Sequence, residues 1–425
     1  MIIAEWIAKF IHTIATRLFH RGGETWPGEI AQYFLRNPRN IASLFKGIIY
    51  VVGTNGKTST TKMLVQVMRD NGFDVITNAS GANMLNGVLS SILAQKKYSK
   101  NAGYIGIFEV DEFALESVTE VLAPTHILFL NVVRDQLDRY GEVRNVLSLW
   151  KNILGKNTAC MVIANAYDPG LSWVCENVPK NKLHWYGIPE QFLKKESTVL
   201  GDSSYCFFCN HKLDYNGMYV SHLGKWYCPS CKKKSEKAFT WEEQDIHSLV
   251  TMPDYVTINM QGVYVLAKLF EISRDQFFAS ASLWEPAYGR GEIRKSGNAT
   301  VTFVLGKNPA SWTVALRDSL KKKKYSTVVL GLNNQIPDGQ DVSWIWDADI
   351  DSKNLRHVMH IWTFGDRAHD MAVRLHMEGI QVEKVYTNAN YCFADVKKKS
   401  EEVLMLSNYT AMLNSRRALL GKAIL

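Results

Sequence analysis

Short apolar segments alternate along most of the chain with longer segments in which apolar residues recur at helical spacing. The apolar segments expected to be strands are 48–52, 105–110, 126–132 and 159–164 in the first part of the chain, and 301–305, 327–332, 358–363 and 382–387 in the last part. Alternation of this kind is typical of parallel sheets whose strands are joined by crossover helices. The pattern therefore predicts an α/β fold.

A stretch with Pro286 and Gly289 separates the two series of strands, and we place a domain boundary near it, at about residue 280. A chain of 425 residues is also too long for one ordinary hydrophobic core. We therefore expect an N-terminal helical segment at 1–45, a central domain at 46–280 and a smaller α/β domain at 281–425.

The first twenty residues carry apolar side chains at helical spacing, with Lys9 and Arg17 among the other positions. Such a helix packs on its own domain, which we favour, or lies on a membrane surface. Glu5 and Lys9 interrupt its apolar run, and no small-residue cleavage site follows, so the pattern is not that of a signal peptide. No apolar run of the chain reaches the roughly 18 residues needed to span a bilayer. We therefore expect a cytoplasmic protein, peripheral at the inner membrane face if the helix contacts lipid.

Composition excludes a disordered chain, because 46% of the residues are apolar and only 21% are charged. The formal net charge of +8 suggests an anionic partner, such as nucleic acid, a membrane surface or a phosphorylated substrate. A surface rich in solvated lysine explains the charge equally well. The lysine runs 232–234 and 321–324 lack the interleaved aromatic residues of a groove for single-stranded nucleic acid. We expect no nucleic-acid partner.

The segment 48–60 combines an apolar strand, a turn bounded by two glycines and the start of a helical pattern. Backbone N–H groups of such a turn and the positive end of the helix bind phosphate oxygens. Lys57 would add positive charge, and Thr58 would bind Mg²⁺ through its hydroxyl. Val51 stands where the usual phosphate loop has a glycine, so this loop is a compact variant. The sequence therefore predicts an ATP site. The expected contacts are Gly53, Thr54, Asn55, Gly56, Lys57, Thr58 and Ser59.

Polar residues follow three of the predicted strands. Glu109 stands at the end of one strand, the turn 134–142 follows the next, and Asn165 and Asp168 follow a third. The carboxyl ends of parallel strands form the crevice in which open α/β sheets bind ligands, so these residues are expected to converge there. Glu109 is a candidate ligand of Mg²⁺, directly or through water.

Four of the seven cysteines form two Cys-x-x-Cys pairs with 18 residues between them: Cys206, Cys209, Cys228 and Cys231. Four thiolates at this spacing suit a tetrahedral Zn²⁺ without an open position, so we predict a structural zinc ribbon at about 203–234. Disulfides are the poorer explanation in a cytosolic chain. Of the cysteines that stand alone, Cys160 lies beside a predicted strand and is better explained as a small buried side chain.

The compact phosphate loop, Glu109, the turn 134–142 and the segment around Asn165 and Asp168 together resemble the Mur ligase superfamily. Within it, the chain is similar to the MurT subfamily of synthetase subunits. This narrower likeness rests on the inserted four-cysteine ribbon, on the turn Arg-Asp-Gln-Leu-Asp-Arg-Tyr-Gly-Glu at 134–142, and on the segments 288–292, 307–310, 338–349, 365–375 and 408–413. The resemblance covers nearly the whole chain.

The resemblance implies a Mur ligase-like central domain with a parallel sheet and an inserted four-cysteine zinc ribbon, followed by a smaller Rossmann-like C-terminal domain. It also implies an ATP-dependent synthetase that turns the α-carboxylate of D-glutamate in lipid II into an acyl phosphate. Ammonia would attack this intermediate to give D-isoglutamine, and a glutaminase partner of the GatD type would supply the ammonia. Lipid II would be met at the inner membrane face, where a basic protein is attracted to anionic lipid.

For the active site, the resemblance implies that Thr58 and Glu109 hold Mg²⁺, while Lys57 offsets the charge on the transferred phosphoryl group. The nucleotide would also be contacted by Asn83, Asn165 and Asp168, the last two facing its base and ribose.

The resemblance further implies that an aspartate of the C-terminal domain completes the Cys–His–Asp triad of the partner by orienting its imidazole. The segment 338–349 offers Asp347 and Asp349, and we favour Asp349.

The chain departs from the family in three places. Members usually carry an asparagine directly after the tyrosine that Tyr264 matches and another three positions later, and both are missing here, so one contact near the nucleotide is expected to be absent. The segment 77–83 lacks the charged pair that is common at its third and fourth positions. Many Mur ligases use a modified lysine as a metal bridge, and no local motif identifies Lys194 or Lys195 as that residue.

Two other functions fit parts of the pattern. A Mur-type or polyglutamate ligase that adds an amino acid would need its own amino-acid pocket in the C-terminal domain. An ATPase acting on nucleic acid would use the lysines near the ribbon, and its binding would weaken steeply with salt. The ribbon is inserted within the α/β block, however, which favours a structural clamp or a docking surface.

Overall fold

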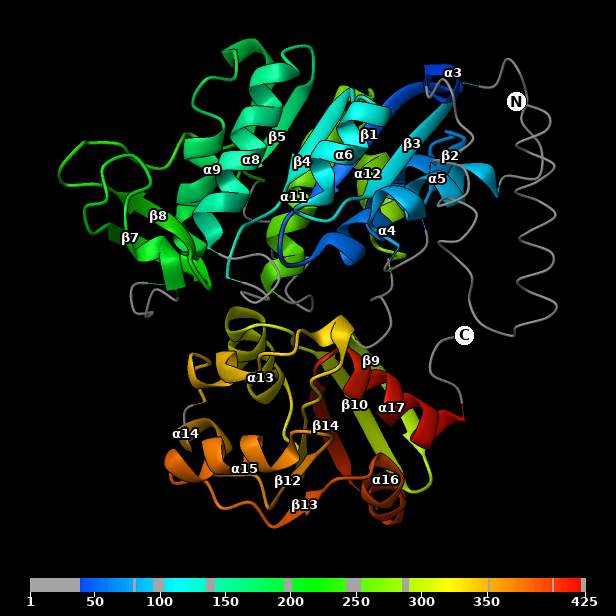
Figure 1. Cartoon of the computed structure of the whole chain (residues 1–425), viewed down its shortest axis with the longest axis vertical. Helices are drawn as coiled ribbons and strands as arrows, with labels where there is room; N and C mark the ends of the chain where they lie inside the picture. The colour runs from blue at the N-terminus through cyan, green and yellow to red at the C-terminus, as the bar shows by residue number, and fades with distance from the viewer. Residues whose placement is uncertain are drawn as a thin grey trace. The chain divides into compact units, whose positions relative to one another are not determined.

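Figure 1 shows the computed structural model of the chain, which describes residues 39–78, 82–94, 103–134, 142–194, 201–241, 254–284, 290–350, 352–399 and 401–421. These residues divide into two compact units, one with the residues up to Val133 and from Val143 to Trp284, the other with Arg134, Glu142 and the residues from Glu285 onward. The helix predicted within the first twenty residues lies outside the described residues, as do turn residues 135–141. Within the described ranges, no helix combines the length and apolarity needed to cross a bilayer.

The first unit is built on a parallel sheet with the strand order β2-β3-β1-β4-β5-β6. The strands are β1 (Phe45–Val52), β2 (Val75–Thr77), β3 (Tyr104–Glu109), β4 (His126–Phe129), β5 (Met161–Asn165) and β6 (Leu183–Tyr186). The run from Ile48 to Val52 in β1 is buried on both faces of the sheet, which explains why its apolar residues are continuous rather than alternating. The four strands predicted for this part are confirmed, and β4 ends at Phe129, before its predicted end.

Helices cover both faces of this sheet (Figure 1). One face carries α4 (Lys57–Asp70) and α11 (Asp254–Leu269), with α12 (Arg274–Ala281) against α4, and the other carries α5 (Leu85–Leu93), α6 (Ala114–Val121), α8 (Val143–Lys156) and α9 (Pro169–Val174). In α8, Leu147, Trp150 and Leu154 recur at helical spacing and are all buried, so one face of the helix enters the core. Short helices complete the unit: α3 (Arg39–Ala42), η1 (Lys180–Lys182), η2 (Glu190–Phe192) and η3 (Gly201–Ser204).

Between β6 and α11 the chain forms a small module that we call the cysteine ribbon, residues 203–234. It contains the antiparallel hairpin of β7 (Asp214–Val220) and β8 (Leu223–Tyr227), drawn in green in Figure 1. Leu213 and Trp226 pack with Cys206 and Cys228 in a core of its own. The ribbon is thus inserted within the first unit.

The second unit contains another sheet, with the order β13-β12-β11-β14-β10-β9. The strands are β9 (Arg290–Ser296), β10 (Ala299–Leu305), β11 (Thr327–Gly331), β12 (His360–Phe364), β13 (Lys384–Tyr386) and β14 (Glu402–Ser407). All neighbours are parallel except β9 and β10. The four strands predicted here are confirmed, but the prediction missed the central strand β14. Its apolar run, 403–406, is too short to be distinguished from part of a helix by periodicity alone.

Two apolar cores lie on the two faces of this second sheet. One is formed with α13 (Pro309–Lys322), α14 (Ser352–Leu355) and α15 (Ala368–Met377), and the other with α16 (Ala389–Lys398) and α17 (Tyr409–Leu420). The short helices η4 (Ile336–Asp338) and η5 (Ser343–Trp346) follow β11. Parallel strands with helices on both faces make this unit a second α/β domain.

Candidate active site

The phosphate loop follows β1 and ends where α4 begins. Gly53 and Gly56 adopt φ angles of 147° and 91°, which other residues rarely adopt. A Cβ atom on Gly53 would lie 2.9 Å from the carbonyl oxygen of Asn131, and one on Gly56 would lie 2.4 Å from Nδ2 of Asn259. Both glycines are therefore required by backbone conformation and by space. The loop lies at the N-terminus of a 14-residue helix, as a phosphate site requires.

Asn131 fixes the shape of this loop. Its carbonyl oxygen accepts a hydrogen bond from Thr54 N at 3.0 Å, and its side chain bonds Asn55 twice, accepting from N at 3.0 Å and donating to O at 2.9 Å. The next turn contributes as well, because Val133 N donates to Thr54 Oγ1 at 3.1 Å. The sequence analysis did not identify Asn131, because the predicted strand 126–132 included it, whereas β4 ends at Phe129.

Lys57 is held back over the loop by a buried ion pair. Its Nζ lies 2.9 Å from Glu112 Oε2 and 2.6 Å from the carbonyl oxygen of Gly53, and both charged side chains are less than a tenth exposed. Glu112 is fixed in turn, since its carbonyl oxygen accepts from Trp150 Nε1 at 2.9 Å. A phosphate in the loop would compete with Glu112 for the ammonium group. The sequence analysis chose Glu109 and missed Glu112, which stands three residues later.

Glu109 ends β3 at the same edge of the sheet and is buried. Asn78 clamps its backbone, accepting from Glu109 N at 3.0 Å and donating to Glu109 O at 2.8 Å. Asn83 is brought close by a backbone bond, because its carbonyl oxygen accepts from Asp111 N at 2.9 Å. Thr58 is half-buried in the first turn of α4. The fold therefore gathers Thr58, Glu109 and Asn83 at the carboxyl edge of the sheet, where the sequence predicted a ligand site.

Asn165 and Asp168 are completely buried. Asn165 donates from Nδ2 to the carbonyl oxygen of Leu130 at 3.2 Å and accepts from Tyr167 N at 3.1 Å. Asp168 caps α9, with its Oδ1 accepting from Gly170 N at 2.8 Å. These bonds stay inside the protein, so in this conformation the two residues fix the ends of β4 and β5. Their contact with base and ribose stays a prediction.

Asn259 on α11 also reaches the loop. It lies next to Gly56 and lines a small cavity between α4 and α11 that also contains Ser59. Within the described residues, Asn259 Oδ1 and Ser59 Oγ are buried without a hydrogen-bond partner. Tyr264, by contrast, packs among aromatic side chains in the core. The asparagine that α11 offers to this site therefore precedes Tyr264 instead of following it, which the sequence analysis did not foresee.

Lys194 belongs to the surface of the first unit. Its Nζ pairs with Asp254 Oδ2 at 2.8 Å, and half of its side chain is exposed. The structure gives it no contact with the phosphate loop. Lys195, the other lysine considered as a metal bridge, lies outside the described residues.

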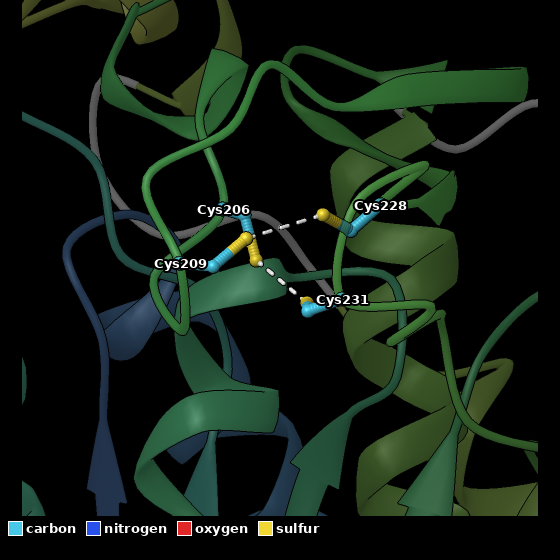
Figure 2. A group of neighbouring side chains, drawn as sticks. All are labelled: Cys206, Cys209, Cys228 and Cys231. Carbon is cyan, nitrogen blue, oxygen red and sulfur yellow. Dashed lines mark hydrogen bonds between the residues drawn. The ribbon is translucent and has the colours of Figure 1, made fainter.

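The four ribbon cysteines converge on one point, as Figure 2 shows. Their sulfur atoms all lie within 4.8 Å of one another, with Cys206 and Cys231 3.6 Å apart and Cys209 and Cys228 3.5 Å apart. Four thiolates around one Zn²⁺ would be about 3.8 Å apart, given a tetrahedron with Zn–S bonds of about 2.3 Å. The cluster can therefore hold a metal ion and is compatible with a zinc ribbon.

Both Cys-x-x-Cys pairs sit in the same kind of turn. Cys206 N donates to His211 O at 2.8 Å, and Cys228 N donates to Lys233 O at 2.8 Å. The residue after each pair, Asn210 or Lys232, has a positive φ angle near 60°. A repeated turn of this kind places both thiols of a pair on the same side of the backbone.

The local environment separates the Cys209 thiol from the buried thiols. The backbone N–H of His211 donates to Cys209 Sγ and lowers the pKa of that thiol to about 6, whereas burial raises the pKa of the Cys206 thiol to about 12. Burial also raises the pKa of Cys160 to about 12 and raises the pKa of Cys175 and Cys392. The three lone cysteines are thus buried thiols that resist ionisation and lack the character of nucleophiles.

Asp347 and Asp349 lie in the second unit, just after η5. Asp349 Oδ2 accepts from Arg317 Nη2 at 3.2 Å, and its backbone N–H donates to Thr313 Oγ1 at 2.9 Å. The side chain of Asp349 is 43% exposed, and that of Asp347 is 59% exposed. Asp347 Oδ2 lies 3.5 Å from Arg134 Nη1, whereas Asp349 is held by two residues of α13. Both carboxylates are exposed enough to meet a partner molecule.

Residues 51–214 match the family described as Mur ligase middle domain, and residues 305–412 match the family described as MurT ligase C-terminal. Lipid II isoglutaminyl synthase (glutamine-hydrolyzing) subunit MurT of Streptococcus pneumoniae (strain ATCC BAA-255 / R6) is 28% identical over 97% of this chain and 95% of its own length. The subunit of the same name from Staphylococcus aureus (strain N315) is 24% identical over 96% of both chains. The solved pseudomurein peptide ligase type C from Methanothermus fervidus is 16% identical, covers 85% of this chain and 76% of its own, and superposes with a TM-score of 0.63.

The fold and these similarities define the class of protein: the chain has the Mur ligase fold and is an ATP-dependent ligase of that class. Enzymes of this class use ATP and Mg²⁺. More particularly, its two domains are a Mur ligase middle domain and a MurT-type C-terminal domain, and it is similar to MurT along nearly its whole length.

Proposed function

We propose that the chain is the synthetase subunit that amidates the α-carboxylate of D-glutamate in lipid II, with ammonia supplied by a glutaminase partner of the GatD type. The observation that carries the proposal is the similarity to MurT over at least 96% of the chain, including a C-terminal domain of the MurT type. The phosphate loop with its lysine and nearby carboxylates is the chemistry that such an enzyme needs.

The reaction requires two transfers. A carboxylate resists attack by ammonia because neither of its oxygens is a leaving group. Transfer of the γ-phosphoryl group of ATP to one oxygen gives an acyl phosphate and ADP. Ammonia then attacks the acyl carbon, the C–O bond to phosphate breaks, and the amide forms after loss of a proton from nitrogen. The protein must hold the phosphates and offset the charge that develops on them.

The described residues can be assigned to these tasks. Lys57 would leave Glu112 and neutralise charge on the transferred phosphoryl group. Thr58, in the first turn of α4, and Glu109, at the end of β3, would hold Mg²⁺, which supplies further positive charge at the phosphates when bound. The backbone of Glu112 would stay in place during this change, because its carbonyl oxygen accepts from Trp150 Nε1.

The nucleotide would extend from the loop along the carboxyl edge of the sheet. Asn259 lies beside Gly56 of the loop with a buried side chain, and Asn83, which is half-buried, is bonded through its backbone to Asp111. Asn165 and Asp168 would contribute by fixing the strand ends or, after rearrangement, by direct contact with base and ribose. We place the protein in the cytoplasm at the inner face of the membrane, where its lipid-linked substrate would be reached.

The amidation assay tests the proposal directly. The purified chain is incubated with Mg-ATP, ammonium and a lipid II that carries D-glutamate, and the mass of the product is measured. We expect the mass change of a carboxylate converted to an amide, and its dependence on ATP is the control. Coupling of an added amino acid in place of amidation would move the chain to the amino-acid-adding Mur ligases and overturn the proposal.

We further propose that the ribbon cysteines hold one structural Zn²⁺. Metal analysis of the purified chain should give about one zinc per chain, and Cys228→Ser should remove most of it, because a structural zinc site needs all four ligands. Cys392→Ala, which removes a buried thiol from the second unit, should leave the zinc content unchanged. A wild-type chain with a stable ribbon and no zinc would contradict this assignment.

A further inference from the structure

A buried histidine of the cysteine ribbon, His222, forms a hydrogen bond with a residue at the edge of the central sheet. Ser221, with a φ angle of 55°, turns the chain between β7 and β8, and His222 follows it into the interior, where it is 1% exposed. Its Nε2 lies 2.9 Å from Oδ2 of Asp168, which is completely buried. Because an ionised carboxylate can only accept, Nε2 carries the proton and donates. The ribbon thus donates a hydrogen bond to a residue of the ATP-binding domain.

Asp168 also holds the backbone that follows β4. Its Oδ1 is occupied by the N–H groups at the start of α9, and its Oδ2 accepts both from His222 and from Val132 N, the latter at 2.8 Å. The carboxylate is therefore fixed on both oxygens. Its position determines where the backbone of Val132 lies.

Val132 lies between the two residues that hold the phosphate loop. Asn131 on one side binds Thr54 N and both backbone groups of Asn55, and Val133 on the other side binds Thr54 Oγ1. A shift of Val132 would therefore move both of the loop's supports. The ribbon is therefore connected to the phosphate loop by an unbroken series of hydrogen bonds and peptide bonds between adjacent residues.

The ribbon does not depend on His222 for its own attachment. Arg144 of α8 lies between the rings of Trp173 and Phe207, 5.7 and 5.6 Å from their centroids, and donates to the carbonyl oxygen of Phe207 at 3.3 Å. Gly224 N donates to Tyr167 O at 3.2 Å. Loss of the His222 side chain should consequently leave the ribbon docked, so that its effect on the loop can be measured separately.

We propose that His222 is a positioning residue through which the cysteine ribbon fixes the phosphate loop for nucleotide binding. The ribbon is then part of the ATP-binding apparatus, and the metal that orders it supports nucleotide affinity from a distance. This inference rests on the proposed use of ATP and on metal binding by the four cysteines.

The test compares His222→Ala with His222→Gln, whose amide group can donate to Asp168 in place of the imidazole. Lys212→Ala, at an exposed position of the ribbon, is the matched control. Three quantities are measured on each variant: the dissociation constant of Mg-ATP by calorimetry, the hydrogen-exchange rates of the amides of Thr54, Asn55 and Val132, and the zinc content.

In His222→Ala, we expect ATP to bind roughly tenfold more weakly and the three amides to exchange roughly tenfold faster, because one hydrogen bond to a buried charge is lost. His222→Gln should restore most of both properties, and Lys212→Ala should match the wild type. Zinc content should stay unchanged in all three variants. Removal of zinc from the wild type with a chelator should speed exchange of the same three amides.

Two results would overturn the inference. One is a zinc-loaded His222→Ala with wild-type ATP affinity and wild-type exchange at Thr54, Asn55 and Val132. The other is a wild-type chain whose loop amides stay as protected after zinc removal as before it, because the ribbon would then not fix the loop. Failure of the proposed function would be recognised separately from failure of this inference. In that case the wild-type chain itself would not bind Mg-ATP, before any variant is compared.

Discussion

Lys57→Ala is expected to lower the rate of ATP-dependent amidation at saturating ATP by at least about a hundredfold, the effect of removing one preorganised charge donor from a phosphoryl or acyl transfer site. We expect this loss of rate because of the position of the lysine. Lys57 is the cation that the fold places within the phosphate loop, with its Nζ held 2.6 Å from the carbonyl oxygen of Gly53. The measurement is the amidation rate with ammonium as nitrogen source. Wild-type activity in Lys57→Ala would show that this lysine of the phosphate loop takes no part in the reaction.

Stability must be separated from catalysis in this variant. Lys57→Ala removes the positive charge that Lys57 places beside the buried carboxylate of Glu112, and losing one partner of a buried ion pair costs about 3–5 kcal/mol. The double variant Lys57→Met/Glu112→Gln removes both charges, so its free energy of unfolding should recover towards the wild type while its activity stays low. Lys62→Ala, an exposed lysine on the same helix, is the control and should change neither quantity appreciably.

Asp349→Asn is expected to lower glutamine-driven amidation by at least about a thousandfold while leaving ammonium-driven amidation near the wild-type rate. An aspartate that orients a catalytic imidazole contributes about that much when it is replaced by its amide. The anchoring of Asp349 by Arg317 and Thr313 fits a residue that must present its carboxylate in a fixed direction. The measurement compares both nitrogen sources in the presence of the glutaminase partner.

Asp347→Asn serves as the matched control for Asp349→Asn, because both carboxylates are exposed and stand two positions apart. The preference for Asp349 predicts that Asp347→Asn keeps glutamine-driven activity. The opposite pattern would assign the role to Asp347. Equal loss with glutamine and with ammonium in Asp349→Asn would place the residue in the synthetase site and contradict its role in the partner's triad.

Much of the architecture could be predicted because it depends on local patterns. The apolar run from Ile48 to Val52 gave a strand that is buried on both faces, and the glycines at 53 and 56 gave a loop whose φ angles and contacts admit no side chain. The spacing of the four cysteines likewise predicted sulfur atoms that meet within 4.8 Å. In each case the chemistry lies within a short stretch or in a fixed spacing along the chain.

The partners of these residues could not be found in the same way, because they are distant in sequence and common in type. Asn131 stands 76 positions from Asn55 and Glu112 stands 55 positions from Lys57, and only the parallel order of the strands brings them together. Asn259 was overlooked because the family pattern directed attention to the residues after Tyr264. A single asparagine or glutamate carries no signal of its own until the fold gives it a neighbour.

The sequence by itself determined an α/β fold, a glycine-bounded loop of the phosphate-binding type and four cysteines that could hold a metal ion, since those properties follow from apolar periodicity, backbone restrictions at glycine and fixed ligand spacing. Only the tertiary structure decided how the loop is held. It paired Lys57 with Glu112 and placed the Asp168 carboxylate in hydrogen bonds with Val132 N and with His222 of the ribbon. The physical reason is that burial makes each polar group require a partner, and the folded chain alone decides which partner is within reach.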